Sequence, residues 1–195
     1  MKLFLKMKAW QLFVLLFGAH FLMMASGMIG GDPRRMFIIM PIGMLVFLAV
    51  FMGWFWTLGI HTNRWVPEEI RPSLRRFRLG LGYAAVYMLF FLVFFMLMSS
   101  GRGGGGLFAL IFPFHILAMV CMFYALYFVA KNFVMAERKQ QVGFYEFAGP
   151  FFLIWMYPIG VWFIQPRINR MFEQHEDTQQ GCSTVSSEGA PSDEL

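Results

Sequence analysis

The chain has 195 residues, of which 58% are hydrophobic and only 14% are charged, and its formal net charge is +5. Soluble domains carry about 25% charged residues, so this composition excludes an ordinary soluble enzyme. The basic residues lie beside long apolar runs, an arrangement typical of contact with anionic lipid headgroups and not with nucleic acid. The two cysteines, Cys121 and Cys182, do not form the pattern of a disulfide framework.

Five apolar segments follow one another along the chain. They cover residues 10–29, 36–60, 79–98, 107–130 and 148–165. The first four have about the 20 residues that a helix needs to cross ~30 Å of hydrocarbon. A backbone in lipid must satisfy its own hydrogen bonds, and the period-two alternation of barrel strands is missing here. The sequence therefore predicts an all-α, polytopic membrane bundle over residues 1–170.

The first segment follows Lys2, Lys6 and Lys8, an arrangement that also precedes a cleaved signal sequence. The apolar run is longer than a signal core, and Trp10 at its start suits an interfacial anchor. We therefore expect a retained first span.

Arg75, Arg76 and Arg78 form a basic cluster directly before the third segment. We expect these arginines to lie in the headgroup layer as a collar that sets the topology. A patch that binds anionic lipid or a partner protein is the alternative interpretation.

The fifth segment is short and carries Pro150 and Pro158. A proline inside a helix removes one backbone hydrogen bond and usually kinks the helix. We expect a kinked fifth span, with a re-entrant segment as the alternative, and a crossing would place Cys182 opposite the N-terminus. Residues 171–195 are acidic and Ser-rich, and we expect them to be disordered.

The distribution of Lys and Arg predicts the orientation of the bundle. The side that holds the N-terminus carries eleven of these residues against five if all five segments cross. The split becomes thirteen against three if only four segments cross and the tail returns. Cytoplasmic loops carry the excess of positive charge, so both arrangements predict a cytoplasmic N-terminus.

His20 and His115 are the two ionisable residues well inside the predicted spans, where such groups are costly and often functional. At 1.5 Å per residue they lie at nearly the same depth. His115 shares a helical face with Ala118 and Ala125, and small residues favour close helix contact, so we expect His115 to point into the bundle.

Two inward histidines at one depth could serve a proton relay or transport path, ligate a haem iron, or hold a metal. No spacing of Cys or His is typical of a metal site. We therefore favour structural hydrogen bonds for both residues, with no cofactor and no metal.

Catalytic motifs are missing from the sequence. There is no His-Glu-x-x-His, no Gly-x-Ser-x-Gly and no pair of intramembrane Asp residues. A nucleophile needs a base within reach, and no pattern provides one. We expect a protein that is not an enzyme.

The end of the fifth segment reads Pro-Ile-Gly-Val-Trp-Phe-Ile-Gln-Pro-Arg-Ile-Asn, from Pro158 to Asn169. This dodecad resembles a group of small uncharacterised bacterial integral membrane proteins with the C-terminal signature "PIGxWxIQPRIN". The resemblance implies a protein of the bacterial inner membrane and supplies no activity. We interpret the signature as a helix stop in the headgroup layer, with Trp162 as an anchor and Arg167 and Arg170 reaching lipid phosphates.

These features favour a non-enzymatic subunit or assembly factor, surrounded by membrane lipids, that contacts another membrane protein through its helices. The small-residue pairs Ala49/Gly53 and Gly80/Ala84 would allow close helix crossings. A transporter or channel-like protein that uses the two histidines is the alternative, and a haem-binding electron carrier is a third.

Overall fold

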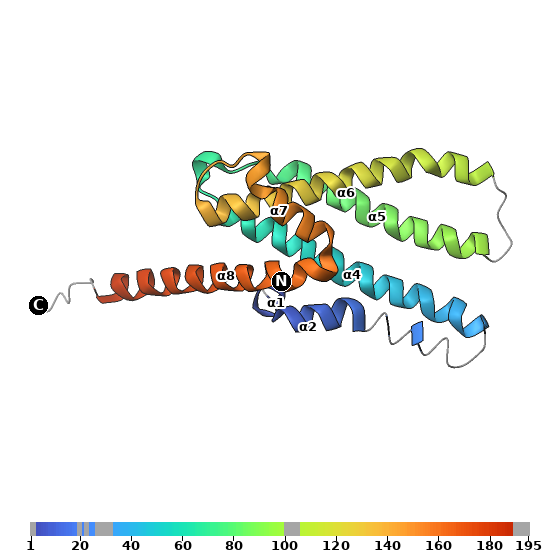
Figure 1. Ribbon diagram of the computed structural model, residues 1–195, viewed down its shortest axis with the longest axis horizontal. Helices are drawn as coiled ribbons and strands as arrows, with labels where there is room; N and C mark the ends of the chain where they lie inside the picture. Colours follow the sequence, from blue (N-terminus) through green and yellow to red (C-terminus); the bar gives the residue numbers. More distant parts are fainter. Residues whose placement is uncertain (1–2, 19–20, 22–23, 26–32, 100–105, 189–195) are drawn as a thin grey trace, which may run out of the picture.

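The computed structural model describes residues 3–18, 21, 24–25, 33–99 and 106–188, and this part of the chain is helical without any strand (Figure 1). The predicted all-α class is thus confirmed. The elements are α1 (Leu3–Lys6), α2 (Ala9–Phe13), the π-helical turn η1 (Val14–Gly18), α4 (Pro33–Trp65), the 3-10 turn η2 (Glu68–Ile70), α5 (Leu74–Ser99), α6 (Gly106–Arg138), α7 (Phe144–Trp155) and α8 (Tyr157–Glu188).

Three of the described helices are long and apolar enough to cross a membrane. The candidate spans are Pro41–Trp65, Leu74–Met98 and Ala109–Arg138, and they correspond to the predicted second, third and fourth segments. They support a membrane protein. In the first predicted span, the described residues form a shorter apolar helix over Ala9–Gly18. Residues 19–20, 22–23 and 26–32, and with them His20, lie outside the described residues, so a first crossing is not confirmed.

The three long helices end where the sequence supplies a reason. α4 ends at Trp65, and Pro67 disfavours helical backbone at the residue before it. α6 ends at Arg138 because Lys139 adopts a left-handed φ of 57°. The Lys139 N–H then donates to the carbonyl oxygen of Met135 at 2.8 Å, as in a left-handed helix cap.

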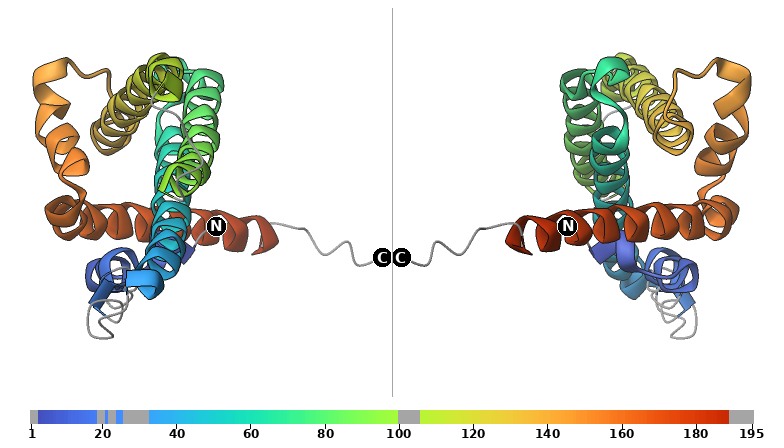
Figure 2. Two further views of the ribbon diagram at one scale, coloured as in Figure 1. Left: turned by 90° about the vertical axis from the view of Figure 1, so that its right-hand side faces the viewer. Right: turned by 90° about the vertical axis from the view of Figure 1, so that its left-hand side faces the viewer.

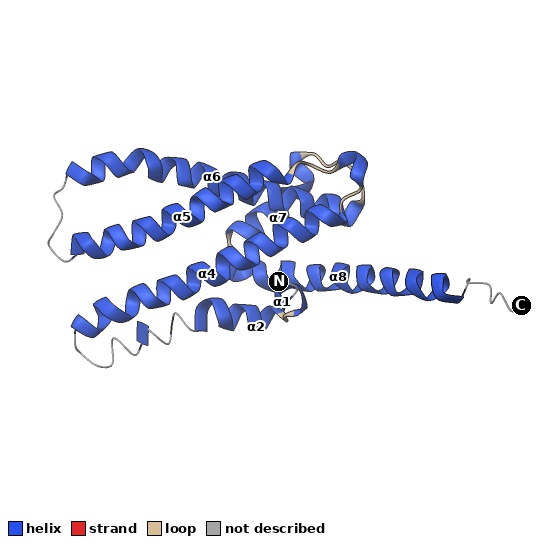
Figure 3. Ribbon diagram, turned by 180° about the vertical axis from the view of Figure 1, so that it is seen from behind, coloured by secondary structure: helices blue, strands red, loops and turns tan. Residues whose placement is uncertain are grey.

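The long helices form a bundle with two packing centres. The larger centre holds Trp54, Phe55, Phe77 and Phe133, all fully buried. A smaller one lies between α5 and α6 around Tyr87, Phe94, Ile111 and Ala118. From the larger centre, α4 diverges from the α5–α6 pair toward the far ends of these helices (Figures 1 and 3).

One of the two predicted small-residue pairs lies at a helix contact. Gly80 faces Cys121 of α6, and Ala84 on the same face of α5 is fully buried. In the other pair, Gly53 of α4 faces the ring of Phe4 in the N-terminal segment, but Ala49 is exposed. The Gly80/Ala84 pair therefore serves packing within this chain.

The fifth segment is not one kinked span, and that expectation is corrected by the fold. α7 ends at Trp155, and Met156 leaves the helix with ψ of 54° before α8 begins. α8 then runs back, so that Gln165 contacts Phe4 and Met7 and the ring of His175 stacks on Trp65. Figure 2 shows α6 between α5 and α7, with α8 passing across the long helices. The fifth segment thus enters the bundle and returns to the end from which it came.

The turn between α7 and α8 depends on two residues. Pro158 stands in the first turn of α8, where its missing N–H leaves no hydrogen bond unmade. Gly160 is buried against the last turn of α7, and a Cβ atom there would lie 1.7 Å from the carbonyl oxygen of Leu153. A side chain at position 160 is therefore incompatible with this turn.

The predicted helix stop at Gln165–Pro166 also differs from the structure, whereas the predicted disorder of residues 171–195 stays a prediction, with residues 189–195 outside the described residues. α8 continues through Pro166 to Glu188. A stripe of buried side chains at helical spacing explains the continuation, because it packs α8 on the bundle past the proline: Val161, Ile164, Ile168, Met171 and Phe172. Pro166 itself is exposed on the opposite side.

Candidate functional site

The buried side-chain amide of Gln165 joins α8 to the N-terminal segment and to α4. Gln165 is fully buried, and its Nε2 donates to the carbonyl oxygens of Phe4 at 2.7 Å and Met7 at 3.1 Å. Its Oε1 accepts from Nε1 of Trp54 at 3.3 Å. Asn169, one turn further on, bonds Gln165 through Oδ1 and donates from Nδ2 to Met7. We call this group the Gln165 junction.

The Gln165 junction supplies hydrogen bonds to the backbone carbonyls of Phe4 and Met7, at the end of α1 and in the turn before α2. The chain leaves helical geometry at Met7 and Lys8, and the last carbonyls of a helix have no partner within it. Side-chain amides four residues apart on α8 supply those partners. From the sequence we interpreted this stretch as a helix stop in the headgroup layer, and that interpretation did not predict the junction. A pair of amides at i, i+4 inside an apolar stripe was the signal that could have revealed it.

Arg167, which we expected to reach lipid phosphates, is bonded to protein groups, and its contact with lipid stays a prediction. Its guanidinium makes a bidentate contact with the carboxylate of Glu137: Nε donates to Oε1 at 3.1 Å, and a second nitrogen donates to Oε2. It also lies 4.8 Å from the centre of the Phe133 ring. This side chain therefore fastens α8 to α6.

The other predicted interface residues lie on the surface. Arg75, Arg76 and Arg78 are exposed in the first turns of α5, and Trp162 and Arg170 are exposed on α8. Contact of these five side chains with headgroups stays a prediction. The structure does not bring the α5 cluster and the α8 residues together through any bond among the described residues.

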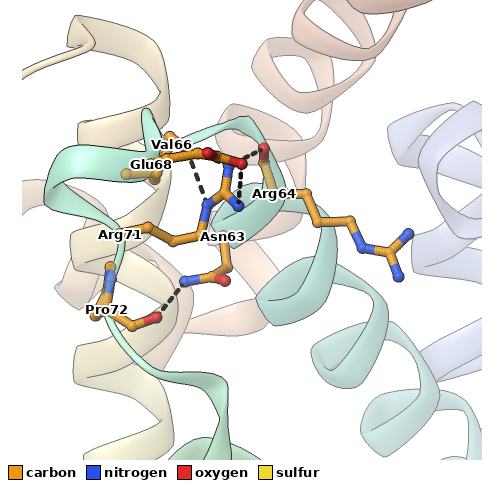
Figure 4. Close-up of polar contacts among 6 residues, drawn as sticks. All are labelled: Asn63, Arg64, Val66, Glu68, Arg71 and Pro72. Atoms are coloured by element: carbon orange, nitrogen blue, oxygen red, sulfur yellow. Dashed lines mark hydrogen bonds and ion pairs between the residues drawn. The ribbon is translucent and has the colours of Figure 1, made fainter.

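A second buried polar group fixes the turn between α4 and α5. Nδ2 of Asn63 donates to the carbonyl oxygen of Pro72 at 2.9 Å and to Oδ1 of Asn132 at 3.2 Å. Arg71 closes the turn by donating to the carbonyl oxygens of Val66 and Arg64 (Figure 4). Asn63 and Asn132 are both buried, so each amide costs stability unless bonded.

Lys139 and His175 meet at the same end of the bundle. Nζ of Lys139 donates to the carbonyl oxygen of Trp65 at 2.8 Å and lies 3.5 Å from Nε2 of His175. Burial lowers the pKa of Lys139. Burial, and next the positive charge of Lys139, lower the pKa of His175. His175 is therefore neutral at pH 7 and able to accept a hydrogen bond from the lysine.

This cluster lines a cavity of about 450 Å³ together with Arg167 and Arg170. The cavity is basic, but Glu137 stands in its wall and neutralises Arg167.

His115 makes the kind of interhelical contact that the sequence predicted. Its Nδ1 lies 3.1 Å from the hydroxyl of Tyr87 on α5. His115 is half-buried, whereas Ala118 and Ala125 on its face of α6 are buried. Both His115 and Tyr87 line a cavity of about 340 Å³ whose walls come from α4, α5, α6, α7 and α8. Sequence reasoning did not find Tyr87 as the partner.

His20, the second histidine of the predicted pair, lies outside the described residues. Within the described part of the chain, no group of three or more His, Cys, Asp and Glu side chains is arranged to hold a metal ion.

Comparison of the chain with models of known protein families, with curated proteins and with solved structures finds no match. The assignment of a function therefore rests on the geometry described above.

Proposed function

We propose that the protein is a non-enzymatic membrane subunit or assembly factor, whose membrane helices hold a long helix in place for contact with another membrane protein. The observation that carries this proposal is the course of α8. This helix is fixed at its base by Gln165 and Arg167 and continues as backbone helix to Glu188.

The polar part of α8 extends beyond the bundle. Among the side chains that the structure describes, the last in α8 with contacts to other elements are His175, on Trp65, and Glu176, which lies 3.3 Å from Nζ of Lys6. The twelve residues from Asp177 to Glu188 add ~18 Å of helix at 1.5 Å per residue. Figure 1 shows this end of α8 reaching away from the other helices. We call residues 177–188 the α8 arm.

We place the arm in the bacterial cytoplasm and the bundle in the inner membrane. The Gln165 junction, the Lys139 cluster and the turn around Asn63 bring together the N-terminal segment, both basic connections and α8. In this arrangement thirteen of the sixteen Lys and Arg residues belong to one side of the membrane. The excess of positive charge supports a cytoplasmic location for that side, and the resemblance in the sequence supports the inner membrane.

The test is co-purification in mild detergent. The full-length protein and a chain that ends at Glu176 are expressed with the same N-terminal tag, and the proteins that accompany each are identified by mass spectrometry. We expect a membrane protein that accompanies the full chain and is lost from the shortened one. The shortened chain should keep its thermal stability because it retains the contacts that fix the base of α8, from Gln165 to Glu176.

This function would be contradicted if the full-length protein, extracted in mild detergent, is a monomer with no accompanying protein. So would a partner that binds the shortened chain equally well, because the arm would then have no part in the contact.

A further inference from the structure

Two adjoining chambers lie between α4, α5 and the start of α8. The first, of about 340 Å³, is the cavity lined by His115 and Tyr87. The second, of about 180 Å³, is lined by Met44, Leu48 and Leu92 among other apolar side chains. Phe51, Met88 and Tyr157 line both chambers. The two chambers adjoin at these shared residues; His115 and Tyr87 give the first a polar part, and the second is lined mainly by apolar side chains.

The hydrogen bond of His115 determines which group the polar part of the first chamber offers. The Tyr87 hydroxyl has no other hydrogen-bond acceptor among the described residues. If Nδ1 carried the proton, both the Tyr87 hydrogen and the Nε2 lone pair would lack partners. If Tyr87 donates to Nδ1, the imidazole carries its proton on Nε2, and only that N–H lacks a partner in the described part of the chain. The second arrangement leaves fewer polar groups unsatisfied and is favoured in an apolar site.

A second donor stands at the boundary of the two chambers. The Tyr157 ring packs among Phe17, Phe47 and Phe51, with centroid distances of 5.2 to 5.7 Å. Its hydroxyl makes no hydrogen bond to any described residue. The residues that line the two chambers therefore include two groups able to donate, Nε2–H of His115 and O–H of Tyr157, and neither has an acceptor bonded to it among the described residues.

The walls of the first chamber suit a flat ring. Phe51, Phe123, Trp155 and Tyr157 contribute aromatic faces, and Met119 and Met122 add side chains that adapt to the shape of a ligand. The volume is within the range of small-molecule sites, ~300–1,000 Å³. Trp155 and Met119 are 50% and 45% exposed on the outside of the bundle, so a lipid-soluble molecule has a lateral route to the chamber.

We propose that this space binds a quinone with an apolar chain, whose ring carbonyl accepts a hydrogen bond from His115 and whose chain lies in the second chamber. A quinone combines the required features, because it has a flat ring, carbonyl acceptors and a hydrocarbon tail. A lipid acyl chain would fill the second chamber but would leave the His115 donor without an acceptor. The site would give the membrane protein a small-molecule ligand in addition to the protein partner proposed above.

Binding is measured with 2-methyl-3-decyl-1,4-naphthoquinone added to the full-length protein in detergent. The quinone quenches tryptophan fluorescence, and Trp155 lies in the wall of the site. We expect saturable quenching that is reduced in Trp155→Phe and kept in Trp162→Phe, since Trp162 does not line either chamber. Trp54 contacts Phe51 of the cavity wall and accounts for the quenching that remains in Trp155→Phe. The matched ligand 2-methyl-3-decylnaphthalene, which lacks the carbonyls, should compete about five- to tenfold less well, the equivalent of one hydrogen bond.

The variants separate hydrogen bonding from shape. His115→Phe keeps an aromatic ring and loses the donor, and we expect it to weaken quinone binding about five- to tenfold with no effect on the naphthalene. His115→Gln restores an N–H donor and should recover most of the affinity. Thermal melting of each variant without ligand shows whether it is folded.

Equal affinity for the two ligands would overturn the proposal and assign the space to lipid chains. Quenching of the same size in Trp155→Phe and in the unaltered protein would overturn it as well, because the quinone would then bind away from Trp155. If His115→Phe does not fold, the comparison of the two ligands on the unaltered protein still decides between these results.

Discussion

The amide of Gln165 donates to the carbonyl oxygen of Met7, 3.1 Å away across 158 residues of sequence. This contact fastens the N-terminal segment to α8, and Trp54 adds α4 to the same amide. The fold therefore depends on a polar residue inside an apolar helix, where an unmade hydrogen bond is costly.

Replacement of Gln165 by Leu should destabilise the bundle. The change leaves the Phe4 carbonyl and the Trp54 N–H without their partner, whereas the Met7 carbonyl keeps its hydrogen bond from Asn169. The unmade hydrogen bonds cost on the order of 1–3 kcal/mol. The measurement is the thermal melting temperature in detergent. The control is the same substitution at Gln141, which is exposed between α6 and α7 and should change the melting temperature little. Equal melting of both variants would show that the junction contributes no stability.

Gly160→Ala should disrupt the turn between α7 and α8. The added methyl group would meet the carbonyl oxygen of Leu153 at 1.7 Å, so backbone must move, and overpacking of this kind costs about 1–3 kcal/mol or more. Gly149→Ala is the control, because nothing lies within 4 Å of a Cβ atom there. We expect the first variant to melt at lower temperature and the second to melt like the original protein. A stable Gly160→Ala protein would mean that α7 and α8 do not pack as described.

Stability should fall as the pH drops below about 6.5, in part because of His175. Burial, and next the charge of Lys139, hold the pKa of folded His175 below the 6.5 that is usual for a histidine side chain. Between the folded and unfolded pKa values the unfolded chain binds more protons, so the free energy of unfolding rises with pH in that window and decreases on acidification through it. Below the folded pKa this contribution does not change further. Melting curves from pH 5.5 to 7.5 measure the effect.

Two variants test whether His175 causes this pH dependence of stability. His175→Gln should flatten it, whereas Lys139→Met should weaken it by removing the nearby positive charge and leaving the effect of burial. An unchanged slope in His175→Gln would assign the titration to another group.

The sequence predicted the helical class and the three central spans because a run of apolar residues fixes both helix and membrane location. It predicted that His115 faces the bundle, because the small residues on that face of α6 follow the helical period. It did not predict that the segment around Pro158 turns back. A proline permits either a kink or a new helix start, and the choice depends on the space that Gly160 leaves beside Leu153.

The roles of Gln165 and Arg167 were also beyond sequence reasoning. Their partners lie on α1, α4 and α6, and a residue at the end of an apolar run has the same composition signal whether it faces lipid or another helix. The Tyr87 hydroxyl was missed for the same reason, because a tyrosine in a span carries no sign of which helix it faces.

The return of α8 is the central claim, and the side of the membrane that holds Cys182 tests it most directly. Cys182 is labelled with a membrane-impermeant maleimide in a Cys121→Ala background, in intact cells and after lysis. A cysteine introduced as Gly103→Cys, on the connection between α5 and α6, serves as the control for the opposite side and should react in intact cells. We predict that Cys182 reacts only after lysis, on the side that holds the N-terminus. Labelling of Cys182 in intact cells would show that the fifth segment crosses the membrane and would contradict the fold described here.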